Sequence, residues 1–230
     1  MGNQFGAKAM LRSALLMTGS TYVAYAAGLI TSMLIARGLG PADYGRYAYL
    51  IWLSGVLVLL MNHGLTTSAI RFISESLGRQ DSHGARSLHR WFQTRQGWSV
   101  VVVGALFLLA LPLLKPSGWE GDLLIFAGVA LFASVAKAWY LFSISVAKGY
   151  GHFGVEASSV SVLSLVNLVG AGVLALMGMH LVAYMLLFLA VSVAHPAMST
   201  RQLHRVEIRK GGNDCDPTLL ERVKPHLFWT

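Results

Sequence analysis

Residues 13–36 of the chain read SALLMTGSTYVAYAAGLITSMLIA and contain no Asp, Glu, Lys or Arg. A helix rises about 1.5 Å per residue, so a stretch of this length can cross a hydrocarbon core of about 30 Å. A lone extended strand would leave its backbone groups without hydrogen bonds in lipid, which favours a helix. The stretch therefore predicts a first transmembrane helix.

Five more apolar stretches follow, and together with the first they predict an all-α fold, a polytopic membrane helix bundle of about six transmembrane helices. The predicted spans cover residues 13–36, 44–65, 97–114, 123–146, 158–177 and 180–198. Hydrophobic residues make up 55% of the chain and charged residues 12%, whereas a soluble domain has about 25% charged residues. We expect a six-helix transmembrane lobe over residues 1–200 and a polar cytoplasmic tail over residues 201–230.

The basic residues indicate how the chain is oriented in the membrane. The formal net charge is +8, and a basic balance is also typical of nucleic-acid-binding proteins. Most Lys and Arg residues lie in alternate connections between the apolar stretches, whereas the other connections hold only Arg37, Arg46 and Lys115. Cytoplasmic loops carry an excess of Lys and Arg, so both termini are predicted to be cytoplasmic and no nucleic-acid partner is expected.

Small residues recur every four positions along the first predicted helix. They are Ser20, Ala24, Gly28, Ser32 and Ala36. Small residues at this spacing let a second helix approach closely when lipid supplies no hydrophobic drive. The pattern predicts ordinary close packing, and a sliding or gating seam is the alternative.

Lys137 is the most unusual residue of the predicted spans because it lies near the middle of the fourth one. A charge at that depth costs about 2.5–3.5 kcal/mol on insertion scales. No carboxylate of the apolar stretches is an obvious partner, since Glu156 precedes the fifth span. Lys137 is therefore a candidate to meet an anionic ligand such as phosphate. The alternative is a structural lysine that partly reaches towards the headgroups.

Two other polar groups interrupt the apolar stretches. Asn62 and His63 precede Gly64, which weakens the second helix there. They are candidates to line a water-filled cavity, or else they form a satisfied kink. In the fifth span, Ser164 and Asn167 continue a row of polar residues three apart. That row predicts either a cavity lining or interhelical hydrogen bonds.

The sequence gives little support for catalysis. It has no P-loop, no G-x-S-x-G and no H-E-x-x-H pattern. Asp214-Cys215-Asp216 matches the D-x-D of many glycosyltransferases, but it lies in a polar tail without a surrounding α/β domain. Cys215 is the only cysteine, and no His/Cys cluster indicates a metal. We expect no enzyme activity, no cofactor and no metal site.

Three segments together resemble one family of transporters. They are residues 34–48 (LIARGLGPADYGRYA), residues 62–73 (NHGLTTSAIRFI) and residues 147–153 (AKGYGHF). These segments are similar, in the same order, to parts of polysaccharide flippases of the Wzx type. Such flippases belong to the multidrug/oligosaccharidyl-lipid/polysaccharide exporter superfamily, and the resemblance covers essentially the whole chain.

The resemblance implies transport of undecaprenyl-diphosphate-linked polysaccharide repeat units across the bacterial inner membrane. The expected partners are this anionic lipid-linked oligosaccharide and the membrane lipids. In such flippases, cationic side chains of a central cavity are thought to meet the phosphates. Lys137 is the candidate that its location supports, and Arg71, at the inner end of the second helix, is another.

Flippases of this type have two six-helix lobes, as in a MATE-like exporter, and the six predicted spans correspond to the first lobe. We therefore expect a truncated or half-size form that works with a second lobe or a second copy. Residues 219–229 resemble the approach to a seventh helix. The alternatives are a drug or metabolite antiporter of the same superfamily and a non-catalytic membrane subunit of a polysaccharide synthesis complex.

Overall fold

The computed structural model describes residues 7–114 and 122–205, all of whose regular structure is helical. The helices are α1 (Ala7–Asn62), α2 (Leu65–Gly78), α3 (Ser82–Leu114), α4 (Leu123–Gly149), α5 (Gly154–Leu176) and α6 (Leu181–Arg205). Of the predicted tail, residues 201–205 form the end of α6, and residues 206–230, with Asp214 and Cys215, lie outside the described residues. The predicted fold class, a polytopic helical bundle, is confirmed.

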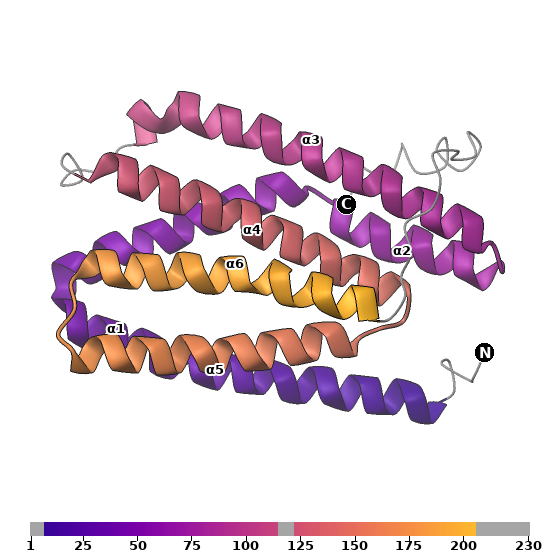
Figure 1. Ribbon diagram of the computed structural model, residues 1–230, viewed down its shortest axis with the longest axis horizontal. Helices are drawn as coiled ribbons and strands as arrows, with labels where there is room; N and C mark the ends of the chain where they lie inside the picture. The colour runs from indigo at the N-terminus through magenta and orange to yellow at the C-terminus, as the bar shows by residue number, and fades with distance from the viewer. Residues whose placement is uncertain (1–6, 115–121, 206–230) are drawn as a thin grey trace.

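Five helices are long and apolar enough to cross a membrane, namely α1, α3, α4, α5 and α6. Of these, α1 consists of two helical arms joined by a kink at Gly40. Figure 1 shows the first arm running to one end of the bundle and the second arm returning beside the other helices. The two arms and α3 to α6 therefore make six apolar passages along the bundle.

The reversal of α1 depends on Gly40, whose φ of 74° and ψ of 174° lie outside the helical region. This combination is essentially restricted to glycine. Pro41 follows at the start of the second arm, where its fixed φ suits a helix and no backbone donor is needed. Near the start of the second arm, Arg46 Nη1 lies 3.4 Å from Asp43 Oδ1.

The two ends of the bundle differ in their connections (Figure 1). The α1 reversal and the α5–α6 turn lie at one end, which we call the reversal end. The α2–α3 and α4–α5 turns lie at the opposite end. There α2 packs on α3 and α4 through a cluster of buried side chains that includes Phe72, Leu88 and Phe142. That packing explains why α3 begins at Ser82 and not at residue 97, where its apolar stretch starts.

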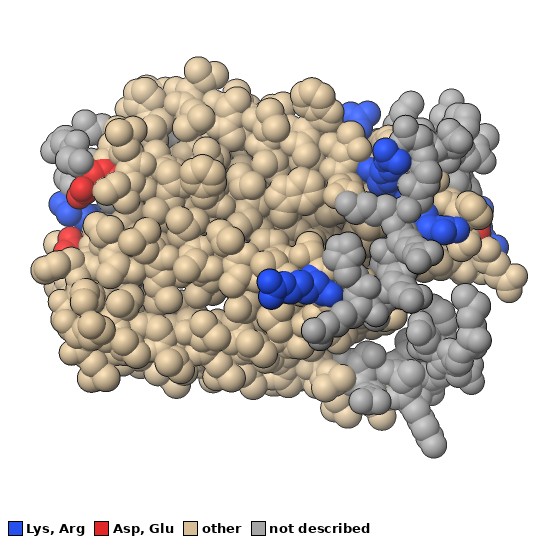
Figure 2. Space-filling model, viewed as in Figure 1, with Lys and Arg blue, Asp and Glu red and all other residues tan. Residues whose placement is uncertain are grey.

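Charged side chains are unevenly distributed along the bundle axis. Figure 2 shows most of the visible Lys and Arg side chains towards the end where α2 and α3 meet. The exposed arginines of α2 and α3 include Arg71, Arg90 and Arg95. This asymmetry is the structural counterpart of the charge pattern along the sequence, and the predicted orientation of the termini rests on it.

Candidate functional site

A cavity of about 490 Å³ lies between both arms of α1 and the helices α4, α5 and α6. Its volume is within the range of about 300–1,000 Å³ that is usual for ligand pockets. The lining residues are Gly28, Thr31, Ser32, Ile35, Tyr44, Tyr47, Ala48, Ile51, Trp52, Lys137, Leu163, Ser164, Asn167, Phe188, Val191, Ser192 and His195. The lining is largely apolar and aromatic, with a small set of polar groups.

Lys137 brings the cationic group of this cavity from the middle of α4. Its Nζ lies 4.2 Å from the centroid of the Phe188 ring on α6. An ammonium over an aromatic face is attracted by the negative face of the ring. None of the ion pairs among the described residues includes Lys137. Glu156, in the first turn of α5, is paired with a different lysine and lies 2.7 Å from Lys148 Nζ. The Phe188 ring thus positions the Lys137 ammonium, and the adjoining cavity leaves space for an anion beside it.

His195 is a second basic group in the cavity wall, and its sequence pattern had not singled it out as a site residue. Its Nδ1 lies 2.7 Å from the carbonyl oxygen of Val191, so Nδ1 carries a proton and donates. Its ring also packs edge-on to Tyr140, with centroids 4.7 Å apart. These contacts fix the ring and leave Nε2 as the free nitrogen. A histidine next to Pro196 inside the sixth apolar stretch was the available signal.

Ser164 and Asn167 of α5 lie in the same wall, on the turn-by-turn spacing that the sequence indicated. Ser158, at the start of their row, instead donates a hydrogen bond of 2.8 Å to the carbonyl oxygen of Gly154. The polar row of α5 therefore contributes to the cavity over its middle part.

The two arms of α1 form the opposite wall with uncharged groups. The hydroxyls of Ser32 in the first arm and Tyr44 in the second lie 2.8 Å apart. Thr31 is buried, and its hydroxyl has no hydrogen-bond partner among the described residues. A Cβ added to Gly28 would meet nothing within 4 Å. Gly28 thus borders open space, which contradicts close helix packing at this position of the small-residue row.

Three candidate residues of the second predicted helix lie away from the cavity wall. Asn62 is buried and its Nδ2 donates to the carbonyl oxygen of Val58 at 3.1 Å. His63 is exposed, and its Nδ1 is 3.2 Å from Ser99 Oγ on α3. Arg71 is exposed on α2, with its guanidinium carbon 5.5 Å from the Phe72 ring centroid.

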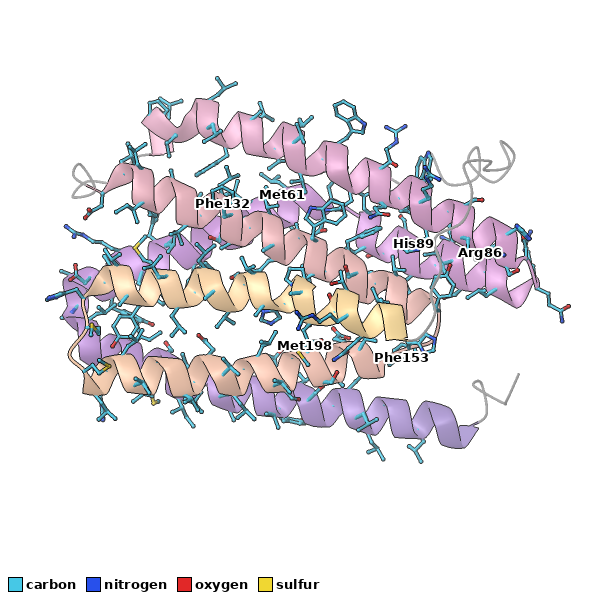
Figure 3. All side chains as sticks on the ribbon, viewed as in Figure 1. Met61, Arg86, His89, Phe132, Phe153 and Met198 are labelled. Carbon is cyan, nitrogen blue, oxygen red and sulfur yellow. The ribbon has the colours of Figure 1, made fainter. Side chains whose placement is uncertain are left out.

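The position of these three residues follows from the break between α1 and α2. Gly64 has a φ of 83° and starts α2 in a new direction. Met61, next to the break, lies beside α3 and α4 in Figure 3 and accepts a hydrogen bond of 2.7 Å from Ser99 Oγ. The helix break is therefore packed against α3, whereas α5 and α6 wall the cavity.

The chemistry of the cavity favours an anionic ligand. Its wall contains Lys137 and His195 but no Asp or Glu. Within residues 7–114 and 122–205, no group of three or more His, Cys, Asp or Glu side chains is arranged to hold a metal ion. The arrangement can bind and orient a ligand with a negative charge and hydroxyl groups.

Comparison with known proteins gives one match. A family model described as polysaccharide biosynthesis protein matches residues 10–205. No curated protein and no solved structure matches the chain significantly. The matched residues include both arms of α1, every later helix and the complete cavity wall.

Proposed function

This chain belongs to the polysaccharide biosynthesis protein family, and on that premise we propose that it flips undecaprenyl-diphosphate-linked polysaccharide repeat units across the bacterial inner membrane. The resemblance to Wzx-type flippases drawn from three sequence segments is confirmed at the level of the family. The long apolar helices make the chain a multi-pass membrane protein. The substrate and the transport step are our proposal.

One observation carries this proposal, namely the position of Lys137 in a cavity without a carboxylate. A lone cation in the bilayer costs about 2.5–3.5 kcal/mol on insertion scales. The diphosphate of the lipid carrier supplies the missing negative charge, and a lysine binds it as a point charge. The bound diphosphate would then offset the unfavourable free energy of the charged lysine in the ligand-free bundle.

The antiporter alternative requires a carboxylate to couple a cation. The described wall of the cavity has none, and for this reason we favour the flippase. A second lobe or a second copy of the chain is part of the proposed assembly. It would close the lipid-linked sugar between two lobes, as alternating access requires.

The proposal is tested by binding and flipping of a fluorescent undecaprenyl-diphosphate-linked oligosaccharide. Binding is measured with the chain in lipid nanodiscs, and flipping in proteoliposomes that also contain the second lobe or copy. Losing one charge-assisted contact should weaken binding roughly tenfold to a hundredfold in Lys137→Ala. Lys137→Glu should weaken it further, because it places a negative charge beside the diphosphate.

The matched control is Lys148→Ala, which removes a second lysine of α4 that lies outside the cavity and is paired with Glu156. This variant should bind the lipid as the wild type does. Wild-type binding and flipping in both Lys137 variants, at unchanged membrane levels, would remove Lys137 from the site and with it the main support for the proposal.

A further inference from the structure

We propose that the cavity binds its ligand in a single orientation, with the phosphate against α4 and α6 and a sugar ring stacked on Trp52 of the α1 wall. This inference rests on the proposed function and adds which side chains recognise the carbohydrate. It follows from the unequal distribution of charge, aromatic rings and hydroxyls around the cavity.

The charged groups lie on one side of the cavity. Lys137 comes from α4 and His195 from α6. The nine lining residues of α1 include no charged side chain and comprise Gly28, Thr31, Ser32, Ile35, Tyr44, Tyr47, Ala48, Ile51 and Trp52. An anion is therefore attracted to the α4–α6 side, and the uncharged part of a ligand faces α1.

Trp52 is positioned so that its ring can stack on a flat, weakly polar part of a ligand. Its ring packs against Tyr49 with centroids 5.7 Å apart, and Tyr49 in turn stacks on Phe126 of α4 at 5.9 Å. The residue is nevertheless 60% exposed, so the neighbouring rings hold it without covering it. The C–H face of a sugar ring can pack on such an aromatic surface, which buries apolar area and keeps the hydroxyls free.

Hydroxyl groups lie on the same wall as this ring. The Ser32 and Tyr44 hydroxyls are 2.8 Å apart and bridge the two arms of α1. Each hydroxyl can both donate and accept, so the pair retains capacity for a ligand hydroxyl. Beside it, Gly28 leaves open space. A wall that carries both an aromatic face and hydroxyl groups is suited to a carbohydrate, whereas an acyl chain needs no polar partner.

The charged wall is linked to the α1 wall through aromatic contacts. Phe188 lies under Lys137 Nζ and meets Tyr47 of α1 edge-on, with ring centroids 6.4 Å apart. Phe188 is therefore in contact with both the cation and the α1 wall. A ligand that joins a phosphate directly to a sugar matches this neighbouring pair of surfaces.

The test compares two kinds of ligand on the chain in nanodiscs. One is undecaprenyl diphosphate alone, and the others are undecaprenyl diphosphates carrying a single hexose, N-acetylhexosamine or deoxyhexose. We expect at least one sugar to strengthen wild-type binding roughly threefold to tenfold, the size of one aromatic contact. Trp52→Ala should remove this gain, so that the variant binds bare and sugar-bearing lipids equally, whereas Trp52→Phe should retain part of it.

Two controls separate stacking from folding and from charge. Trp98→Ala removes a tryptophan of similar exposure, 65%, that lies on α3 outside the cavity, and it should keep the sugar gain. Lys137→Ala should weaken binding of every ligand by the same factor. A wild-type chain that binds bare and sugar-bearing lipids equally, or a sugar gain that survives Trp52→Ala, overturns the inference alone. Failure of the wild type to bind any of the lipids overturns the proposed function, and the inference falls with it.

Discussion

At the scale of single residues, Lys137 lowers the stability of the ligand-free bundle but provides the positive charge that the proposed site needs. It is a cation in an apolar helix with no ion-pair partner among the described residues. Its contact with Phe188 compensates about 0.5–2 kcal/mol, which is less than the insertion cost of about 2.5–3.5 kcal/mol. The difference is unfavourable until an anion binds.

This difference predicts the outcome of Lys137→Met. Methionine has a similar length, fills the same space and carries no charge. We expect the ligand-free variant to be more stable than the wild type by about 0.5–3 kcal/mol, the difference between the insertion cost and the cation–π contact. Thermal unfolding of the purified protein in detergent measures this, and lipid diphosphate should stabilise the wild type but not the variant. A variant less stable than the wild type would identify Lys137 as a structural residue.

At the scale of elements, the positions of the helices could be predicted from the sequence better than the contacts between them. Apolar length locates a span, and Gly40-Pro41 and Gly64 locate the interruptions, because these are local properties. Which helix faces which is set by packing between residues far apart in the chain. For that reason Lys137 could be selected from its depth alone, whereas Trp52 and Tyr44 could not, since tyrosine and tryptophan are ordinary in membrane helices.

The same reasoning explains the remaining candidates. Asn62 and His63 were selected because polar groups in a span must be satisfied. The structure satisfies Asn62 Nδ2 with a backbone carbonyl of its own helix and packs His63 against Ser99 of α3. A polar residue in a membrane helix thus has two outcomes, a ligand cavity or a helix contact, and the sequence pattern is the same for both.

The kink in α1 gives a prediction for an element. Gly40 occupies a backbone region that is essentially restricted to glycine, so Gly40→Ala should destabilise the bundle by about 1–3 kcal/mol. Gly45 is the matched control, since it lies in the second arm at an ordinary helical φ and an added Cβ meets nothing within 4 Å. Gly45→Ala should leave the stability unchanged or raise it by up to about 1 kcal/mol. Equal effects of the two substitutions on thermal unfolding would show that the reversal does not depend on Gly40.

At the scale of the whole molecule, the distribution of charge and the connections agree with each other. The exposed arginines of α2 and α3 lie towards one end, and the reversal of α1 and the α5–α6 turn lie at the other. With six apolar passages, residues 7 and 205 lie at the same end of the bundle. The excess of basic residues towards that end predicts that it faces the cytoplasm.

This assignment can be measured with the single cysteine of the chain, Cys215. It belongs to the predicted cytoplasmic tail, so a membrane-impermeant maleimide should label it in inverted inner-membrane vesicles and not in intact spheroplasts. A second protein combines Cys215→Ala with Asp122→Cys, which places the thiol at an exposed position before α4 near the reversal end. This protein should show the opposite pattern. Labelling of Cys215 from outside would reverse the orientation and place the α4–α5 turn outside the cell, whereas labelling of both positions from one side would contradict six passages.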